Sequence, residues 1–165
     1  MCQYDPDCRA KGIPDHLHQC ERPINQTFDP SESLFYRFKP GEKIKNGKVP
    51  KGIFRVKNMS VLRQIYCRSP NDALYDGERG ISYPDWGVAE LVVGKVESFS
   101  YNGDPPKEYT LKVVHDPLQC VYPHSEVRLF ERGVRLNEVP DGLATLIRVC
   151  LADSCSVAKA PSSIS

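Results

Sequence analysis

Three short turns, each standing between two candidate strands, constrain the fold of this chain more than any other feature of the sequence. Asn46-Gly47 supplies the two positive φ angles of a type I′ hairpin turn, and Arg132-Gly133 stands in a similar position. The hairpins are expected at 43–49, at 96–101 with 108–114 across a proline-containing loop, and at 126–130 with 134–136. Because hairpins join strands that are antiparallel neighbours, the sequence predicts an antiparallel meander.

Further short strands are expected beside these hairpins. Apolar runs predict them at 34–38, 53–56, 86–93 and 143–151. The last of these runs is ambiguous, and Thr145, Ile147 and Val149 on one face favour a strand over a helix.

One or two short helices are expected to pack on this sheet. Ser60 is a candidate cap for a helix over 61–67, and Ser69-Pro70 has the residue order of a helix start. The predicted fold class is therefore α+β, mainly β, with an antiparallel meander sheet of about six strands.

The length of 165 residues fits one domain, which we expect to span 31–155. Residues 1–30 carry Cys and His without an apolar period and predict an irregular N-terminal arm, and the polar segment 156–165 predicts a flexible tail.

Neither a membrane segment nor a secretory signal is expected. No apolar run is long enough to cross a bilayer, and the first residues lack a basic region followed by an apolar stretch. A cytoplasmic location follows as an expectation, and the seven cysteines are then expected to be reduced thiols.

Five potential metal ligands lie close together in the N-terminal arm. They are Cys2, Cys8, His16, His18 and Cys20. Zinc prefers four such ligands, and binding would supply the folding free energy that an arm of low apolar content needs. The predicted ligand set is the three cysteines with one of the two histidines. The other interpretation is that these are ordinary thiols and a surface histidine pair, because the spacing lacks the paired Cys-x-x-Cys of a zinc ribbon.

Basic side chains are concentrated in residues 31–70, which hold ten of the 22 Lys and Arg but only two of the 21 Asp and Glu. Phe35, Tyr36, Phe38 and Phe54 are interleaved with them. Lys and Arg attract phosphates, and exposed aromatic rings stack on bases. The candidate binding residues are Arg37, Lys39, Lys43, Lys45, Lys48, Arg55 and Lys57. An acidic protein partner would suit the same face, and an ordinary strand pair with core aromatics and solvated lysines would have the same pattern.

A second candidate site lies between two predicted strands, where His115, His124 and Glu126 occur within twelve residues. Two imidazoles and a carboxylate can divide general acid and base roles, and Cys120 beside them could instead help to bind a metal. The alternative is a structural loop in which Pro117 and Pro123 mark turns.

Two function classes follow from these patterns. The favoured hypothesis is a small binding or interaction module, with zinc as its possible cofactor, that uses the basic face on nucleic acid or an acidic protein. The alternative is a small hydrolase or transferase at the two-histidine loop. The sequence has no Gly-rich phosphate loop, no Gly-x-Ser-x-Gly, no His-Glu-x-x-His and no Cys-x-x-Cys, which argues against the enzyme classes built on those motifs.

Overall fold

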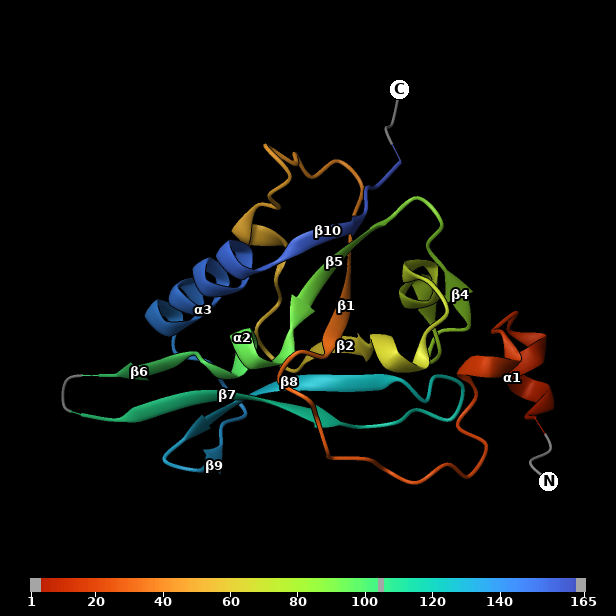
Figure 1. Ribbon diagram of the computed structural model, residues 1–165, viewed down its shortest axis with the longest axis horizontal. Coiled ribbons are helices and arrows are strands. Elements are labelled where there is room, and N and C mark those ends of the chain that lie inside the picture. The colour runs from red at the N-terminus through yellow and green to blue at the C-terminus, as the bar shows by residue number, and fades with distance from the viewer. Residues whose placement is uncertain (1–3, 104–105, 163–165) are drawn as a thin grey trace.

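The computed structural model describes residues 4–103 and 106–162, and its main feature is a curled antiparallel sheet of eight strands (Figure 1). Along the sheet the order is β10-β5-β1-β2-β8-β7-β6, and β9 pairs with the C-terminal end of β8. The strands are β1 (Ser33–Phe38), β2 (Met59–Arg63), β5 (Gly87–Val92), β6 (Ser100–Asn102), β7 (Glu108–His115), β8 (His124–Glu131), β9 (Val134–Arg135) and β10 (Ser156–Lys159). Two further strands, β3 (Tyr75–Asp76) and β4 (Ile81–Ser82), form a small separate sheet.

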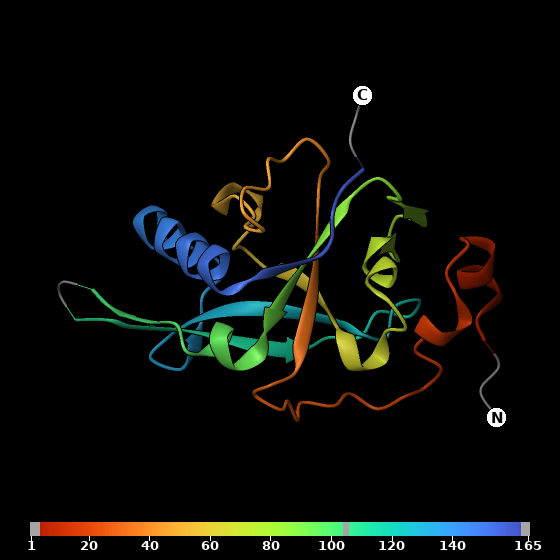
Figure 2. The ribbon, with the colours of Figure 1, turned by 45° about the horizontal axis from the view of Figure 1, so that its top comes forward.

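Short helices complete the described part of the chain. The α-helices are α1 (Pro6–Ala10), α2 (Val93–Glu97) and α3 (Asp141–Ser154), and the 3₁₀ turns are η1 (Asp15–Leu17), η2 (Lys51–Ile53), η3 (Gln64–Tyr66) and η4 (Pro70–Leu74). Figure 2 shows α3 beside β10 and β5, and α1 at the opposite end of the molecule. No helix within the described residues is both long and apolar enough to span a bilayer.

The mainly β, antiparallel class is confirmed, whereas the expected six strands are too few. The expected meander is wrong as a description of the whole sheet, because β1 lies beside β5, β5 beside β10 and β2 beside β8, which are not consecutive strands.

The turns predicted at Asn46-Gly47 and Arg132-Gly133 are present. Asn46 and Gly47 have φ angles of 52° and 73°, but only an isolated bridge between Lys45 and Lys48 forms around them. β6 pairs with β7 and β8 pairs with β9, as expected. The strand predicted at 96–101 is wrong in its first residues, because Val96 and Glu97 end α2 and β6 begins at Ser100. Residues 104–105 of the loop between β6 and β7 lie outside the described residues.

The strand predicted at 143–151 is wrong, because these residues form most of α3. The buried side chains of the helix are Leu143, Ala144, Ile147 and Leu151, which share one helical face, whereas Val149 is exposed. Packing of this stripe against the sheet outweighs the modest strand preference of the β-branched residues. The face proposed from Thr145, Ile147 and Val149 therefore does not exist.

The helix predicted over 61–67 is wrong for residues 61–63, and only Gln64–Tyr66 is helical, as the 3₁₀ turn η3; the strand predicted at 53–56 is also wrong. Residues 59–63 form β2, which pairs with β1 on one side and with β8 on the other. All of its residues except Ser60 are buried, so its sequence lacks the alternation of a half-exposed strand. Ile53 instead ends η2, and Phe54 and Val56 are buried in irregular chain. A short helix does start at Pro70, as 3₁₀ turn η4, but Ser69 makes no side-chain cap.

The described parts of the N-terminal arm and of the predicted tail, residues 4–30 and 156–162, are more ordered than expected. Within the predicted flexible tail, Ser156–Lys159 forms β10 and pairs with β5. In the arm, α1 is capped by Asp5, and a disulfide joins Cys8 of this helix to Cys120 with a Cα–Cα distance of 5.3 Å. Cys20 is disulfide-bonded as well. The expectation of reduced thiols is thus wrong for Cys8, Cys20 and Cys120. For Cys8 and Cys120 the reason is that the fold brings together two residues 112 positions apart in sequence.

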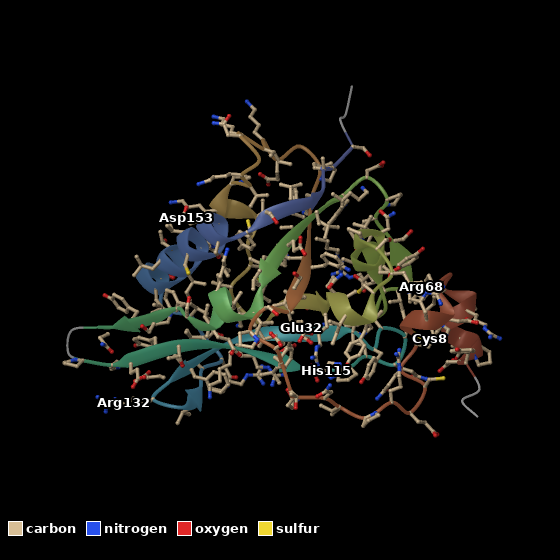
Figure 3. The ribbon with its side chains drawn as sticks, in the orientation of Figure 1. Cys8, Glu32, Arg68, His115, Arg132 and Asp153 are labelled. Atoms are coloured by element: carbon tan, nitrogen blue, oxygen red, sulfur yellow. A yellow bond between two sulfur atoms is a disulfide. The ribbon has the colours of Figure 1, made fainter. Side chains whose placement is uncertain are left out.

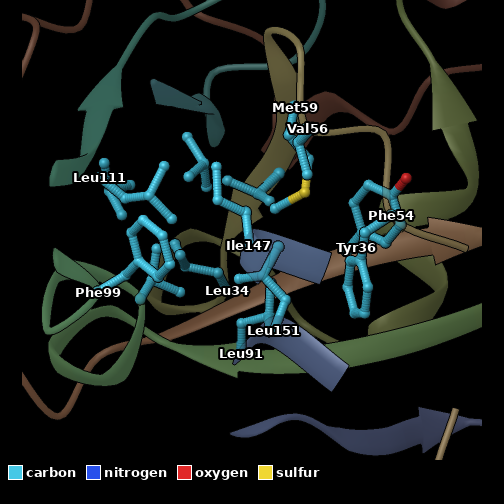
Figure 4. Close-up of a cluster of buried hydrophobic side chains, with 14 of the residues drawn as sticks. Leu34, Tyr36, Phe54, Val56, Met59, Leu91, Phe99, Leu111, Ile147 and Leu151 are labelled. Atoms are coloured by element: carbon cyan, nitrogen blue, oxygen red, sulfur yellow. The ribbon is translucent and has the colours of Figure 1, made fainter. Parts of the chain in front are cut away.

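An apolar core covers each face of the sheet. The larger core lies under α3, where Leu34, Tyr36 and Ile147 meet (Figure 4). Phe35 points to the opposite face, into a smaller core. The other buried members of this smaller core are Cys8, Ile13, Leu17, Leu62, Ala73, Leu74, Val88, Cys120 and Val121. The N-terminal arm is therefore ordered by apolar burial and a disulfide.

Gly87 at the start of β5 is expected to tolerate no larger side chain. A Cβ there would lie 2.4 Å from the Cζ atom of Phe38, which is buried in the larger core. Gly87→Ala should therefore lower the free energy of unfolding by about 1–3 kcal/mol through overpacking. Urea unfolding followed by circular dichroism measures the change.

Gly142 in the first turn of α3 is the matched control for this substitution. A Cβ there would meet no atom within 4 Å, so Gly142→Ala should raise stability by about 0.4–1 kcal/mol. Equal effects of the two substitutions would show that the contact with Phe38 is not what excludes a side chain at Gly87.

Candidate functional site

A cleft of about 790 Å³ opens on the face of the sheet that carries Phe35, Leu62 and His124. Its walls come from residues 35–39 of β1 and the turn after it, from residues 52–60, and from 73–86. Leu118 and Val121, next to Cys120, complete the lining. The disulfide therefore holds one wall of the cleft to the N-terminal arm.

The cleft has more basic than acidic side chains. The basic ones are Arg37, Lys39, Arg55, Lys57 and Arg79, and the acidic ones are Glu42, Asp76 and Glu78. Arg37 is neutralised by Asp76 at 3.2 Å, and Lys57 by Glu138 at 2.6 Å. Lys39 and Arg55 are exposed and make no ion pair with any described residue. These two cations are free to contact an anionic ligand.

The structure brings four of the seven predicted binding residues to this cleft, namely Arg37, Lys39, Arg55 and Lys57. Lys43, Lys45 and Lys48 are exposed on the turn that follows β1 but do not line it.

The aromatic residues that the sequence associated with the basic segment are not available for stacking. Phe35, Tyr36, Phe38 and Phe54 are all buried in the two cores. Tyr83 and Trp86 line the cleft instead, with ring centroids 4.3 Å apart, and both are partly exposed. Sequence reasoning missed them because they lie beyond the basic segment 31–70, and only the fold places them beside its cations.

The ring of His115 is buried, and both of its nitrogens are hydrogen-bonded to backbone groups. It is 1% exposed, its Nδ1 accepts a hydrogen bond from the backbone N–H of Asn25, and its Nε2 lies 2.8 Å from the backbone oxygen of Tyr122. The first contact requires a bare Nδ1 and the second a protonated Nε2, which together define a neutral ring. Burial lowers the pKa of His115, against the opposing effect of its hydrogen bond to Tyr122. Figure 3 labels this residue beside the central strands.

The stability of the protein is expected to fall on acidification because of His115. Its pKa is lower in the folded chain than the ordinary value of 6.5, so the unfolded chain binds more protons. The stabilising contribution is complete above about pH 6.5 and is lost as the pH falls toward the folded pKa. Urea unfolding at a series of pH values should show a flatter slope below about pH 6.5 for His115→Gln than for the native chain. Identical slopes would contradict this assignment.

His124 and Glu126 lie on the opposite face of the sheet from His115. In the antiparallel register His115 pairs with Ser125, and side chains alternate along β8. Glu126 is held by Arg128 at 2.8 Å and Arg135 at 3.7 Å. The three residues of the predicted acid–base site therefore do not converge, and only His124 reaches the cleft.

The described members of the predicted zinc site have other partners. Cys8 is bonded to Cys120, His16 Nε2 lies 2.8 Å from Asp72, and His18 Nε2 lies 2.9 Å from the backbone oxygen of Ile13. Cys20 is disulfide-bonded, and Cys2 lies outside the described residues. Within 4–103 and 106–162, no three His, Cys, Asp or Glu side chains are grouped as a metal site would require.

Comparisons with models of protein families, with curated proteins and with solved structures find no match for this chain. The chemistry of the cleft is therefore inferred from its own residues.

Proposed function

We propose that this protein is a binding module whose cleft holds a short segment of single-stranded nucleic acid. The observation that carries the proposal is the partly exposed Tyr83–Trp86 pair in the same cleft as the unpaired cations Lys39 and Arg55. Aromatic faces stack on bases of any sequence, and cationic side chains attract the phosphates between them.

The aromatic pair favours nucleic acid over an acidic protein. An acidic peptide can be bound by positive charge alone, so a site for such a peptide would not require the stacked aromatic rings. Arg37 lies over the Tyr83 ring at 5.1 Å and is held by the backbone oxygens of Ala73 and Tyr75, so this part of the wall is preorganised. The lysines of the turn after β1, Lys43, Lys45 and Lys48, add positive charge further along the chain.

Trp86 is the single tryptophan of the chain, so its fluorescence reports on stacking directly. Titration with an oligothymidylate of about 12 nucleotides should quench this emission, and the affinity should fall steeply as salt is added. Trp86→Ala should weaken binding, measured by anisotropy of a labelled oligonucleotide, by about 1–3 kcal/mol.

Two variants that each remove one positive charge distinguish binding in the cleft from general attraction to the surface charge. Arg55→Gln should weaken binding and reduce the salt dependence, whereas Lys95→Gln on the exposed surface of α2 should do neither. Binding of polyglutamate as tight as that of the oligonucleotide, without quenching of Trp86, would point to an acidic protein partner and contradict the proposal.

For the location we propose an oxidising compartment in place of the cytoplasm. The reason is the Cys8–Cys120 disulfide, because such bonds persist in oxidising compartments and are rare in cytosolic proteins. Alkylation of free thiols in source cells before extraction, followed by mass spectrometry, shows whether Cys8 and Cys120 are bridged.

Zinc binding in the N-terminal arm stays a prediction. Elemental analysis of protein purified without chelators measures the amount of zinc bound per chain.

A further inference from the structure

Ser60 and His124 form a hydrogen-bonded pair on the floor of the cleft. Ser60 lies on β2 with an exposed side chain, and His124 is the first residue of the neighbouring strand β8. The Nε2 atom of His124 lies 3.2 Å from the Oγ atom of Ser60, and both residues line the cleft. Glu126, which pairs with Ser60 in the register, is occupied by Arg128 and Arg135 and does not compete for the hydroxyl.

The backbone of Asp116 decides the direction of this hydrogen bond. The Nδ1 atom of His124 lies 2.7 Å from the backbone oxygen of Asp116, which can only accept, so Nδ1 carries the proton. In the neutral ring Nε2 then has a free lone pair, and Ser60 donates its hydroxyl proton to it. A reciprocal bond of 3.1 Å from the backbone N–H of Asp116 to the backbone oxygen of His124 holds the two residues together.

We propose that Ser60 is a nucleophile activated by His124, and that the cleft hydrolyses esters that carry a negative charge. The arrangement has the three parts that activation of a serine requires: a hydroxyl facing the binding space, a base within hydrogen-bond distance, and a third group that orients the base. Lys39 and Arg55 of the same cleft select the anionic group of the substrate. This inference shares the cleft and the cations Lys39 and Arg55 with the proposed nucleic-acid binding, but labelling of Ser60 tests it without any binding measurement.

The reaction proceeds in two balanced steps. The Oγ atom of Ser60 bonds to the acyl carbon, its proton passes to Nε2 of His124, and the ester bond breaks as the leaving alcohol takes that proton. Water then adds to the acyl carbon and gives a proton to Nε2. The bond to Oγ breaks, Ser60 recovers the proton, and a carboxylic acid leaves.

An alkyl fluorophosphonate tests the nucleophile, because it forms an Oγ–P bond with loss of fluoride only at an activated serine. Peptide mapping should place the label on Ser60, and Ser60→Ala should abolish it. His124→Asn retains an amide donor near the Asp116 oxygen but has no Nε2, and should slow labelling about 10²–10⁴-fold. Ser100→Ala, at an exposed serine of β6 outside the cleft, should label at the native rate.

Three results would overturn the inference: labelling no faster in the folded than in the urea-unfolded chain, labelling at another serine, or an unchanged rate in folded His124→Asn. If His124→Asn does not fold, the comparison of native protein with Ser60→Ala still decides.

The substrate class is tested with 4-nitrophenyl hemisuccinate against neutral 4-nitrophenyl acetate. Faster hydrolysis of the anionic ester, lost in Arg55→Gln, supports the assignment, and equal rates contradict it.

Discussion

Arg63→Met is expected to lower the free energy of unfolding by about 3–5 kcal/mol, because it leaves the carboxylate of Glu32 buried without its charge partner. Arg63 is 1% exposed and Glu32 6%. Their side chains are joined by two hydrogen bonds, from Nε at 2.6 Å and from one terminal nitrogen at 2.9 Å. Figure 3 labels Glu32 near the centre of the molecule.

Arg63 also holds the N-terminal arm to the sheet. Its remaining donors reach the backbone oxygens of Asn25 at 2.6 Å and Thr27 at 2.9 Å, and its guanidinium lies 4.0 Å from the centroid of Phe28. Methionine fills a similar volume but satisfies none of these acceptors, so the loss adds unpaired carbonyls to the unpaired carboxylate.

Two comparisons isolate the buried charge. Adding Glu32→Leu to Arg63→Met removes the unpaired carboxylate, and the double variant should be more stable than Arg63→Met alone. Lys57→Met breaks the exposed ion pair with Glu138 and should cost no more than about 1 kcal/mol. Urea unfolding measures all of them, and a cost for Arg63→Met as small as that for Lys57→Met would contradict the prediction.

Removal of the Cys8–Cys120 disulfide is the second large effect that we expect. The double variant Cys8→Ala/Cys120→Ala should lose about 3–5 kcal/mol of stability. The two residues are separated by 112 positions, so the bond restricts the unfolded chain over most of its length. Urea unfolding without reductant should show a lower midpoint and a steeper dependence on urea, because the unlinked chain exposes more surface.

Cys150→Ala is the control for this loss. Cys150 has a free thiol and is only partly buried at the edge of the larger core. Its replacement should change stability by less than about 1 kcal/mol. If the double variant lost no more stability than twice the loss in Cys150→Ala, the disulfide would contribute nothing beyond the packing of its two side chains, and the prediction would be wrong.

Much of the local structure could be predicted from the sequence. Asn46-Gly47 and Arg132-Gly133 adopt the positive φ angles expected of turns, and β1, β5, β7 and β8 lie close to the predicted runs. These features depend on backbone preferences and on alternation over a few residues, which any local window of sequence contains. Two of the segments that failed show tertiary pairing or packing outweighing local preference: residues 61–63 became a strand between β1 and β8, and 143–151 became a helix whose apolar stripe packs on the sheet.

The candidate site could be predicted only in part. Lys39 and Arg55 of the basic segment 31–70 are exposed, as is usual for charged side chains, and their part in binding stays a prediction. The pairing of His115 with His124 was wrong, since the strand register places them on opposite faces. Ser60 was expected to cap a helix, and its role beside His124 depends on which strand lies next to β2.

By itself, the sequence determined the antiparallel character of the sheet, its turns and the basic segment, all of which follow from residues close together in the chain. The tertiary structure alone decided the Cys8–Cys120 bond, the Arg63–Glu32 pair, the position of the Tyr83–Trp86 pair in one cleft with Lys39 and Arg55, and the contact of Ser60 with His124. The physical reason is the same in each case. These contacts join segments whose separation in sequence carries no local signal, and only burial of two cores against one curled sheet brings them within reach.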